Sequence, residues 1–238
     1  MANKSRGSRL RAVLCIMLCL VFITGCGRSL VITTGFRRGE VFRLGKEKCM
    51  IAQVRVYLLD LQKRSEAMYG AAVWESSDKE ALQQAVKDQA LSQITRVKAL
   101  GQIAVSRNVM LSNDEKLLAE QVERSFYDGL SEDEKKYIGL DEKGLLKVVN
   151  EYALADKVYR SLGENAEKIY GDFFEKTQCD LNAKYWQKVS LKKIEGNTEA
   201  PGLWECYQTY FGKEGAEETG AVEETEAVEE TGEQKAAQ

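Results

Sequence analysis

The chain has 238 residues, of which 34 are basic and 37 acidic, and none is histidine. The lack of histidine excludes Ser-His-Asp and Cys-His catalysis, HExxH zinc sites and histidine proton relays. Carboxylate or lysine chemistry stays open, but no pattern in the sequence singles out such a group. We therefore expect a protein that is not an enzyme and that uses no metal and no cofactor.

The first 25 residues have the pattern of a lipoprotein signal peptide. Basic residues between positions 4 and 11 precede an apolar run over residues 12–23. That run is too short to span a hydrocarbon core about 30 Å thick. It ends in Ile-Thr-Gly-Cys, which resembles the bacterial lipobox. We expect cleavage between Gly25 and Cys26, acylation of Cys26, and a place on the extracytoplasmic side of the cell membrane. The alternative is an ordinary secretory signal in which Cys26 is incidental.

Charge divides the rest of the chain. Residues 214–238 contain nine glutamates and one lysine, with Glu-Glu-Thr repeated three times. Such a segment cannot bury enough apolar surface to offset the entropy of ordering, so we expect a disordered tail. Residues 26–213 carry a net charge close to zero, which predicts no nucleic-acid binding. The expected zones are the signal (1–25), a tether (26–35), one folded domain (36–213) and the Glu-rich tail (214–238).

Three cysteines remain in the folded domain after the signal is removed and Cys26 is acylated. They are Cys49, Cys179 and Cys206, and no CxxC spacing relates them. A disulfide between one pair is possible outside the cytoplasm. Buried free thiols are the other interpretation, because cysteine packs as a small apolar residue.

The folded domain begins with a predicted β-hairpin. Val41–Leu44 and Cys49–Ile51 are apolar and flank the polar turn Gly45–Lys48. From Ile51 the apolar residues recur near the helical period, which predicts a helix to about Tyr69.

Capping motifs predict where the next helices begin. The motif S/T-x-x-E occurs at Ser77–Glu80, Ser112–Glu115 and Ser131–Glu134, each ahead of an apolar stripe. Asp141 is a further predicted cap, for a helix that ends near Leu162. Three segments follow: a helix from about Gly163 to Thr177, a short strand or helix at Lys188–Ile194, and an amphipathic segment at Leu203–Tyr207. The pattern predicts a mainly α fold, a single helical domain with a small N-terminal hairpin.

The order of these elements resembles the N-terminal chaperone domain of SurA/PrsA-type extracytoplasmic foldases. The resemblance begins at Val41–Gly45 and continues through Tyr69-Gly70 and Val73-Trp74. The stretch Val109–Glu115 is similar to the family's apolar-x-apolar-Ser-Asp-Glu-Glu junction, and Leu130–Glu134 with the Asp141–Leu162 helix completes it. The match covers residues 36–162.

The resemblance implies chaperone-type binding, but the chain departs from the family's usual plan. Lipid-anchored members usually continue into a parvulin-type prolyl isomerase domain, which has histidines in its active site. Here 51 residues separate Leu162 from the tail, too few for that domain, and there is no histidine. The stretch Asp180–Trp186 looks instead like the closing segment of relatives that lack the isomerase. We expect no isomerase activity.

Client binding requires apolar side chains in a concave surface. Met68, Tyr69, Trp74, Phe126 and Tyr127 lie near predicted helix ends and are the candidates. The competing interpretation is that these residues fill the core, since aromatic residues at helical spacing dominate cores as well.

Two functions follow from the sequence. The first is a membrane-anchored holding chaperone for secreted proteins, with unfolded or partly folded chains and the lipid bilayer as its partners. The alternative is a structural or assembly lipoprotein that binds one folded partner at the cell surface. A chaperone is expected to expose a broad apolar surface, and a scaffold one compact patch.

Overall fold

The structure, a computed structural model, describes residues 35–75, 78–192 and 200–212. The predicted signal peptide, its cleavage site, Cys26 and the Glu-rich tail lie outside the described residues. None of the described helices is long and apolar enough to cross a bilayer.

A three-stranded antiparallel sheet with the order β2-β1-β3 contains the predicted hairpin. β1 (Glu40–Leu44) and β2 (Glu47–Met50) are joined by a tight turn at Gly45. Gly45 has a φ of 58°, a left-handed conformation that glycine adopts without a Cβ clash. β3 (Cys179–Leu181) pairs with the other edge of β1, where Leu181 lies opposite Phe42. The sequence did not predict β3, because three residues carry too little alternation to announce a strand.

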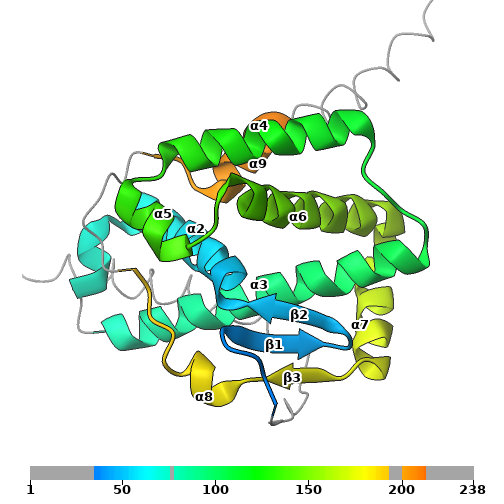
Figure 1. The fold of residues 1–238 in the computed structure, drawn as a ribbon, viewed down its shortest axis with the longest axis horizontal. Coiled ribbons are helices and arrows are strands. Elements are labelled where there is room, and N and C mark those ends of the chain that lie inside the picture. Colours follow the sequence, from blue (N-terminus) through cyan, green and yellow to red (C-terminus); the bar gives the residue numbers. More distant parts are fainter. Residues whose placement is uncertain (1–34, 76–77, 193–199, 213–238) are drawn as a thin grey trace, which may run out of the picture.

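The fold is mainly helical, as predicted. The helices keep the labels of Figure 1, and their bounds are α2 (Ile51–Tyr69), the 3₁₀ turn η1 (Ala71–Glu75), α3 (Lys79–Ser106), α4 (Asn113–Gly129), α5 (Glu132–Ile138), α6 (Glu142–Leu162), the 3₁₀ turn η2 (Gly163–Asn165), α7 (Ala166–Lys176), α8 (Ala183–Trp186) and α9 (Leu203–Phe211).

The predicted caps at two of the three S-x-x-E motifs are confirmed. The Ser112 hydroxyl accepts a hydrogen bond from the Glu115 N–H at 3.1 Å, and Glu115 accepts one from the Ser112 N–H at 2.6 Å. Ser131 and Glu134 make the same reciprocal pair. Asp141 caps α6 by accepting from the Gly144 N–H at 2.8 Å. These bonds satisfy N–H groups that the first helical turn leaves without partners.

Two local expectations need correction. The N-cap of α3 is Asp78 and not Ser77, and the Asp78 side chain makes no cap hydrogen bond. Lys188–Ile194 was expected to be a short strand or helix, but its described part, residues 188–192, has no regular structure. Apolar residues in that stretch are too few to decide a period.

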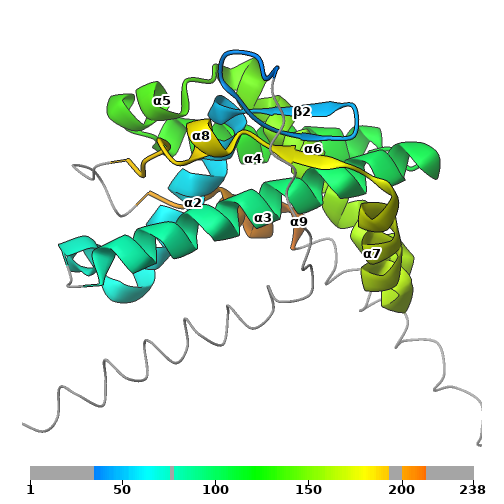
Figure 2. The same cartoon turned by 90° about the horizontal axis from the view of Figure 1, so that it is seen from below.

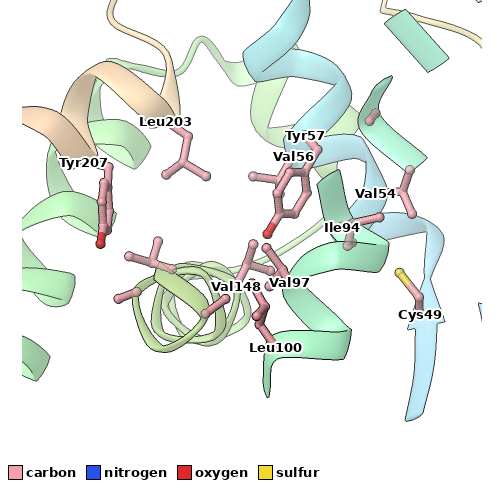
Figure 3. Close-up of a cluster of buried hydrophobic side chains, with 14 of the residues drawn as sticks. Cys49, Val54, Val56, Tyr57, Ile94, Val97, Leu100, Val148, Leu203 and Tyr207 are labelled. Atoms are coloured by element: carbon pink, nitrogen blue, oxygen red, sulfur yellow. The ribbon is translucent and has the colours of Figure 1, made fainter. Parts of the chain in front are cut away.

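The core lies along both sides of α3. In Figure 1, α3 crosses the molecule, with the sheet on one side and α6 followed by α4 on the other. Figure 2 shows α3 along the face opposite α5, with α7 descending from the end of the molecule. Val54, Ile94 and Val97 converge with Val148 of α6 in the buried centre (Figure 3). One apolar core cluster therefore joins the sheet to α9.

Ion pairs fix the helices around α6. Lys98 of α3 and Glu151 of α6 are 2.6 Å apart, and the lysine side chain is only 6% exposed. Lys157 of α6 reaches Glu115 at the start of α4, also at 2.6 Å. A buried cation with a bonded carboxylate holds two helices in one relative register, because losing the partner leaves an uncompensated charge.

Candidate functional site

The five predicted client-binding residues do not form one surface. Met68 and Tyr69, at the end of α2, are 69% and 41% exposed. Phe126 is completely buried in the core, so the prediction that it lines a binding surface is wrong. Trp74 and Tyr127 are half-buried and pack against the core. The core interpretation holds for Phe126, and the binding role of the other four stays a prediction.

Local contacts explain the positions of Trp74 and Tyr127. The Trp74 indole N–H donates to the Glu66 carboxylate at 2.8 Å, which ties η1 to α2. The Lys135 ammonium of α5 lies 5.0 Å from the centre of the Tyr127 ring, a cation–π contact. Both aromatic rings are therefore held at the end of the molecule where α2, α5 and η1 meet.

A second group of exposed apolar side chains lies at the opposite end of α3. Val105, Met110 and Leu117 are 77%, 76% and 56% exposed, and they come from the end of α3, the following turn and the first turns of α4. α3 has 28 residues and is roughly 42 Å long. The group at Met110 and the group at Met68 are therefore at opposite ends of one rigid helix.

A cavity of about 200 Å³ opens between α2, α3, α6 and α9. Its lining residues are Tyr57, Asp60, Arg64, Gln93, Tyr152, Leu203, Trp204 and Tyr207. Leu203 and Tyr207 of α9 face Tyr57 of α2 across the space above α6 (Figure 3). We call this space the α9 cavity.

Asp60 anchors α9 at the edge of the α9 cavity. Its carboxylate accepts the Trp204 N–H at 2.9 Å and pairs with Arg64 at 3.0 Å. Gly202, the N-cap of α9, has no side chain to cap the helix, and a Cβ there would lie 2.7 Å from the Asp60 Oδ1. Burial raises the pKa of Asp60, while Arg64 and the Trp204 N–H act in the opposite direction. A residue of α2 thus supplies the cap that α9 lacks.

Aromatic rings form one wall of the cavity. Tyr152 meets Tyr207 edge to face with 4.8 Å between the ring centres. Tyr207 stacks on Phe211 at 4.5 Å, and the Tyr207 hydroxyl donates to Asp156 at 2.8 Å. Trp204 stands beside them and is 37% exposed, so one of its edges meets solvent. These contacts fix the orientations of the Tyr152 and Tyr207 rings.

Two of the cysteines are buried thiols outside any disulfide. Cys49 lies on β2 and Cys206 on α9, and burial raises the pKa of both thiols. Cys179 on β3 is half-buried. Within the described ranges, no group of three or more cysteine, aspartate or glutamate side chains has the arrangement of a metal site.

Sequence reasoning missed every residue of the α9 cavity. The apolar period of α9 shows which of its faces is buried, but nothing in the sequence places that face opposite Tyr57 and Asp60. No family model, no curated protein and no solved structure matches this chain.

Proposed function

We propose that this protein is a membrane-anchored holding chaperone for secreted proteins, without isomerase activity. In this proposal Cys26 carries the lipid, and the folded domain works on the extracytoplasmic side. It binds unfolded or partly folded chains reversibly, without a nucleotide and without a cofactor.

The observation that carries the proposal is the separation of the exposed apolar side chains. Met68 and Tyr69 lie at one end of α3, and Val105, Met110 and Leu117 lie at the other. An extended client that crosses roughly 42 Å can touch both groups, because about 13 extended residues span that distance. A single folded partner would favour one compact patch instead.

Methionine suits such a surface. Its unbranched, polarizable side chain adapts to many apolar shapes, and it is overused at promiscuous binding surfaces. Met68 and Met110 are the two most exposed methionines of the described domain, at 69% and 76%. Reversible binding of unrelated clients requires several adaptable contacts and few strong ones.

The test is suppression of aggregation for several unrelated unfolded proteins by the mature chain. The matched variant replaces Met68, Tyr69, Val105, Met110 and Leu117 by serine. We expect the concentration for half protection to rise on the order of tenfold, because losing about 1.4 kcal/mol of apolar contact costs tenfold in affinity. Each replaced side chain is exposed, so the melting temperature is expected to stay unchanged. A control variant replaces exposed polar Gln83 and Glu120 by serine and is expected to protect like wild type.

Membrane attachment has its own test. The Cys26→Ala chain is expected to lose all labelling by a fatty-acid probe and to accumulate as precursor, because stable anchoring needs the acyl chains. Equal labelling of wild type and variant would remove the anchor from the proposal while leaving the chaperone activity to be judged separately.

The alternative, a lipoprotein that binds one folded partner, is favoured by one observation. Phe126 is buried and Trp74 and Tyr127 pack against the core, so these three of the five predicted binding residues do not form an open apolar surface. A folded wild-type protein that protects no client at several-fold molar excess would select this alternative.

A further inference from the structure

We propose that the α9 cavity binds a small molecule, a single planar ring that carries a carbonyl or carboxylate acceptor. This site is separate from the exposed apolar groups at the two ends of α3, and the proposal stands whether or not the chaperone function does.

Size limits the ligand to about one ring. The α9 cavity measures about 200 Å³. A cavity of about 150 Å³ in a protein core is large enough to hold benzene. The α9 cavity therefore accepts a benzene-sized or slightly larger ring with one substituent. It is too small for an extended stretch of polypeptide.

The walls favour a flat aromatic ligand. Tyr57, Tyr152, Trp204 and Tyr207 come from three helices and all line the space. Their edges and faces offer the offset and edge-to-face contacts that aromatic pairs prefer. Their own stacking and hydrogen bonds hold Tyr152 and Tyr207 in place, so little side-chain entropy is lost on binding.

Two polar groups at the cavity call for an acceptor on the ring. The Nε–H of Arg64 is shielded from solvent and has no hydrogen-bond partner among the described residues. The Tyr57 side chain is 3% exposed, and its hydroxyl points toward α6 in Figure 3. Tyr57 is also one of the residues that line the cavity. A buried donor without a partner is rare, and an acceptor oxygen on the ligand would satisfy the Arg64 Nε–H. The Tyr57 hydroxyl offers a second donor on the same lining.

Charge complements this assignment. Asp60 and Arg64 pair at 3.0 Å, so the lining carries no net charge. The carboxylate of Asp60 is occupied by Arg64 and the Trp204 N–H. An ammonium ligand would meet Arg64 without a spare carboxylate, whereas a carbonyl or carboxylate meets an available donor.

The experiment titrates the full-length chain, purified in detergent, with benzamide, benzoate and toluene, followed by saturation-transfer NMR and thermal shift. We expect benzamide or benzoate to bind with a dissociation constant on the order of 0.1–1 mM. Toluene, which lacks an acceptor, is expected to bind several-fold more weakly. The probes partition into detergent to the same extent for every variant, so a difference between variants reports binding to the protein.

Three variants make the assignment specific. Leu203→Trp fills the space and is expected to remove binding of all three probes. Tyr57→Phe and Arg64→Lys each remove a donor and are expected to weaken benzamide several-fold while leaving toluene unchanged. The matched control is Tyr137→Phe, which removes a hydroxyl bonded to the Ser190 carbonyl outside the cavity and is expected to change nothing.

Each outcome decides the proposal. Acceptor-dependent binding that Leu203→Trp abolishes supports it. If no probe binds the folded wild type at about 10 mM, well above the range expected for nine-atom ligands, the proposal is overturned. It is also overturned if a short peptide with one phenylalanine binds at the cavity and the free ring compounds do not, because the cavity would then belong to the client site. Loss of the fold in Leu203→Trp leaves the decision to Tyr57→Phe and Arg64→Lys.

Discussion

Two buried glutamates have opposite electrostatic environments. Glu134 lies at the α2–α5 junction and Glu123 lies on α4. Glu134 is 6% exposed and pairs with Lys63 of α2 at 2.9 Å. Glu123 is 8% exposed, and its Oε1 has no partner among the described residues. Their side chains are identical and equally buried. Glu134 has a cation and the Ser131 N–H as partners, and the Oε1 of Glu123 has neither.

The pKa values move in opposite directions as a result. Burial alone raises the pKa of Glu134, but the hydrogen bonds from Lys63 and the Ser131 backbone outweigh it and lower the pKa. Burial raises the pKa of Glu123 to about 7, and the nearby carboxylate of Glu142 adds to the effect. A buried carboxylate therefore supports the fold only where the fold also buries a cation beside it.

Breaking the Lys63–Glu134 pair is expected to lower the free energy of unfolding more than the other changes. Lys63→Met leaves the Glu134 carboxylate buried without its cation, and we expect a loss of about 3–5 kcal/mol in the free energy of unfolding at neutral pH. Chemical denaturation followed by far-UV circular dichroism measures it. The control is Lys168→Met, which breaks the exposed pair with Asp172 and is expected to cost less than about 0.5 kcal/mol. A loss below about 1 kcal/mol for Lys63→Met would mean that water solvates Glu134.

Removing the unpaired charge is expected to stabilise the fold, with an effect that depends on pH. The folded pKa of Glu123, about 7, lies above its ordinary value of 4.5. The destabilisation of the fold by an ionised Glu123 is absent below pH 4.5, grows as the pH rises toward 7, and is complete above pH 7. Glu123→Gln is therefore expected to raise the free energy of unfolding by roughly 1–2 kcal/mol at about pH 8 and by almost nothing at about pH 4.5.

Urea denaturation of wild type and Glu123→Gln at both pH values gives the comparison. The control is Glu120→Gln, an exposed residue of the same helix, for which we expect no pH-dependent gain. An equal gain for Glu123→Gln at both pH values would show that packing, and not charge, causes it.

Removing a cap is expected to have the smallest effect. Ser131→Ala deletes the hydroxyl that accepts the Glu134 N–H, while Glu134 keeps Lys63 and the Ser131 N–H. We expect a loss of about 1 kcal/mol, read from the urea midpoint. Ser112→Ala removes the equivalent cap at the exposed start of α4 and is expected to cost the same amount. A much larger loss for Ser131→Ala would show that the cap also positions the buried ion pair.

The fold was largely predictable because its signals are local. The Ser112, Ser131 and Asp141 caps set helix starts through side chains within three residues, and the hairpin turn depends on Gly45 itself. The start of α3 was placed one residue early, because its N-cap Asp78 makes no side-chain bond. β3 was missed because its only support is pairing with β1, more than 130 residues earlier.

The candidate sites were less predictable. Phe126 and Met68 both lie near helix ends in the sequence, yet one is buried and the other is 69% exposed. Spacing along one helix shows which residues share a face, but not whether another helix covers that face. Only the packing of α4 against α6 and α9 decides that Phe126 belongs to the core.

The sequence by itself determined the starts of α4, α5 and α6 and the hairpin, because each depends on residues adjacent in the chain. Tertiary structure alone decided the α9 cavity and the two buried glutamates. Tyr57, Tyr152 and Tyr207 meet only when α9 returns to α2 and α6. Glu134 has a buried cation beside it because α2 carries Lys63 to it. Burial and pairing are properties of distant segments brought together, and no local pattern records them.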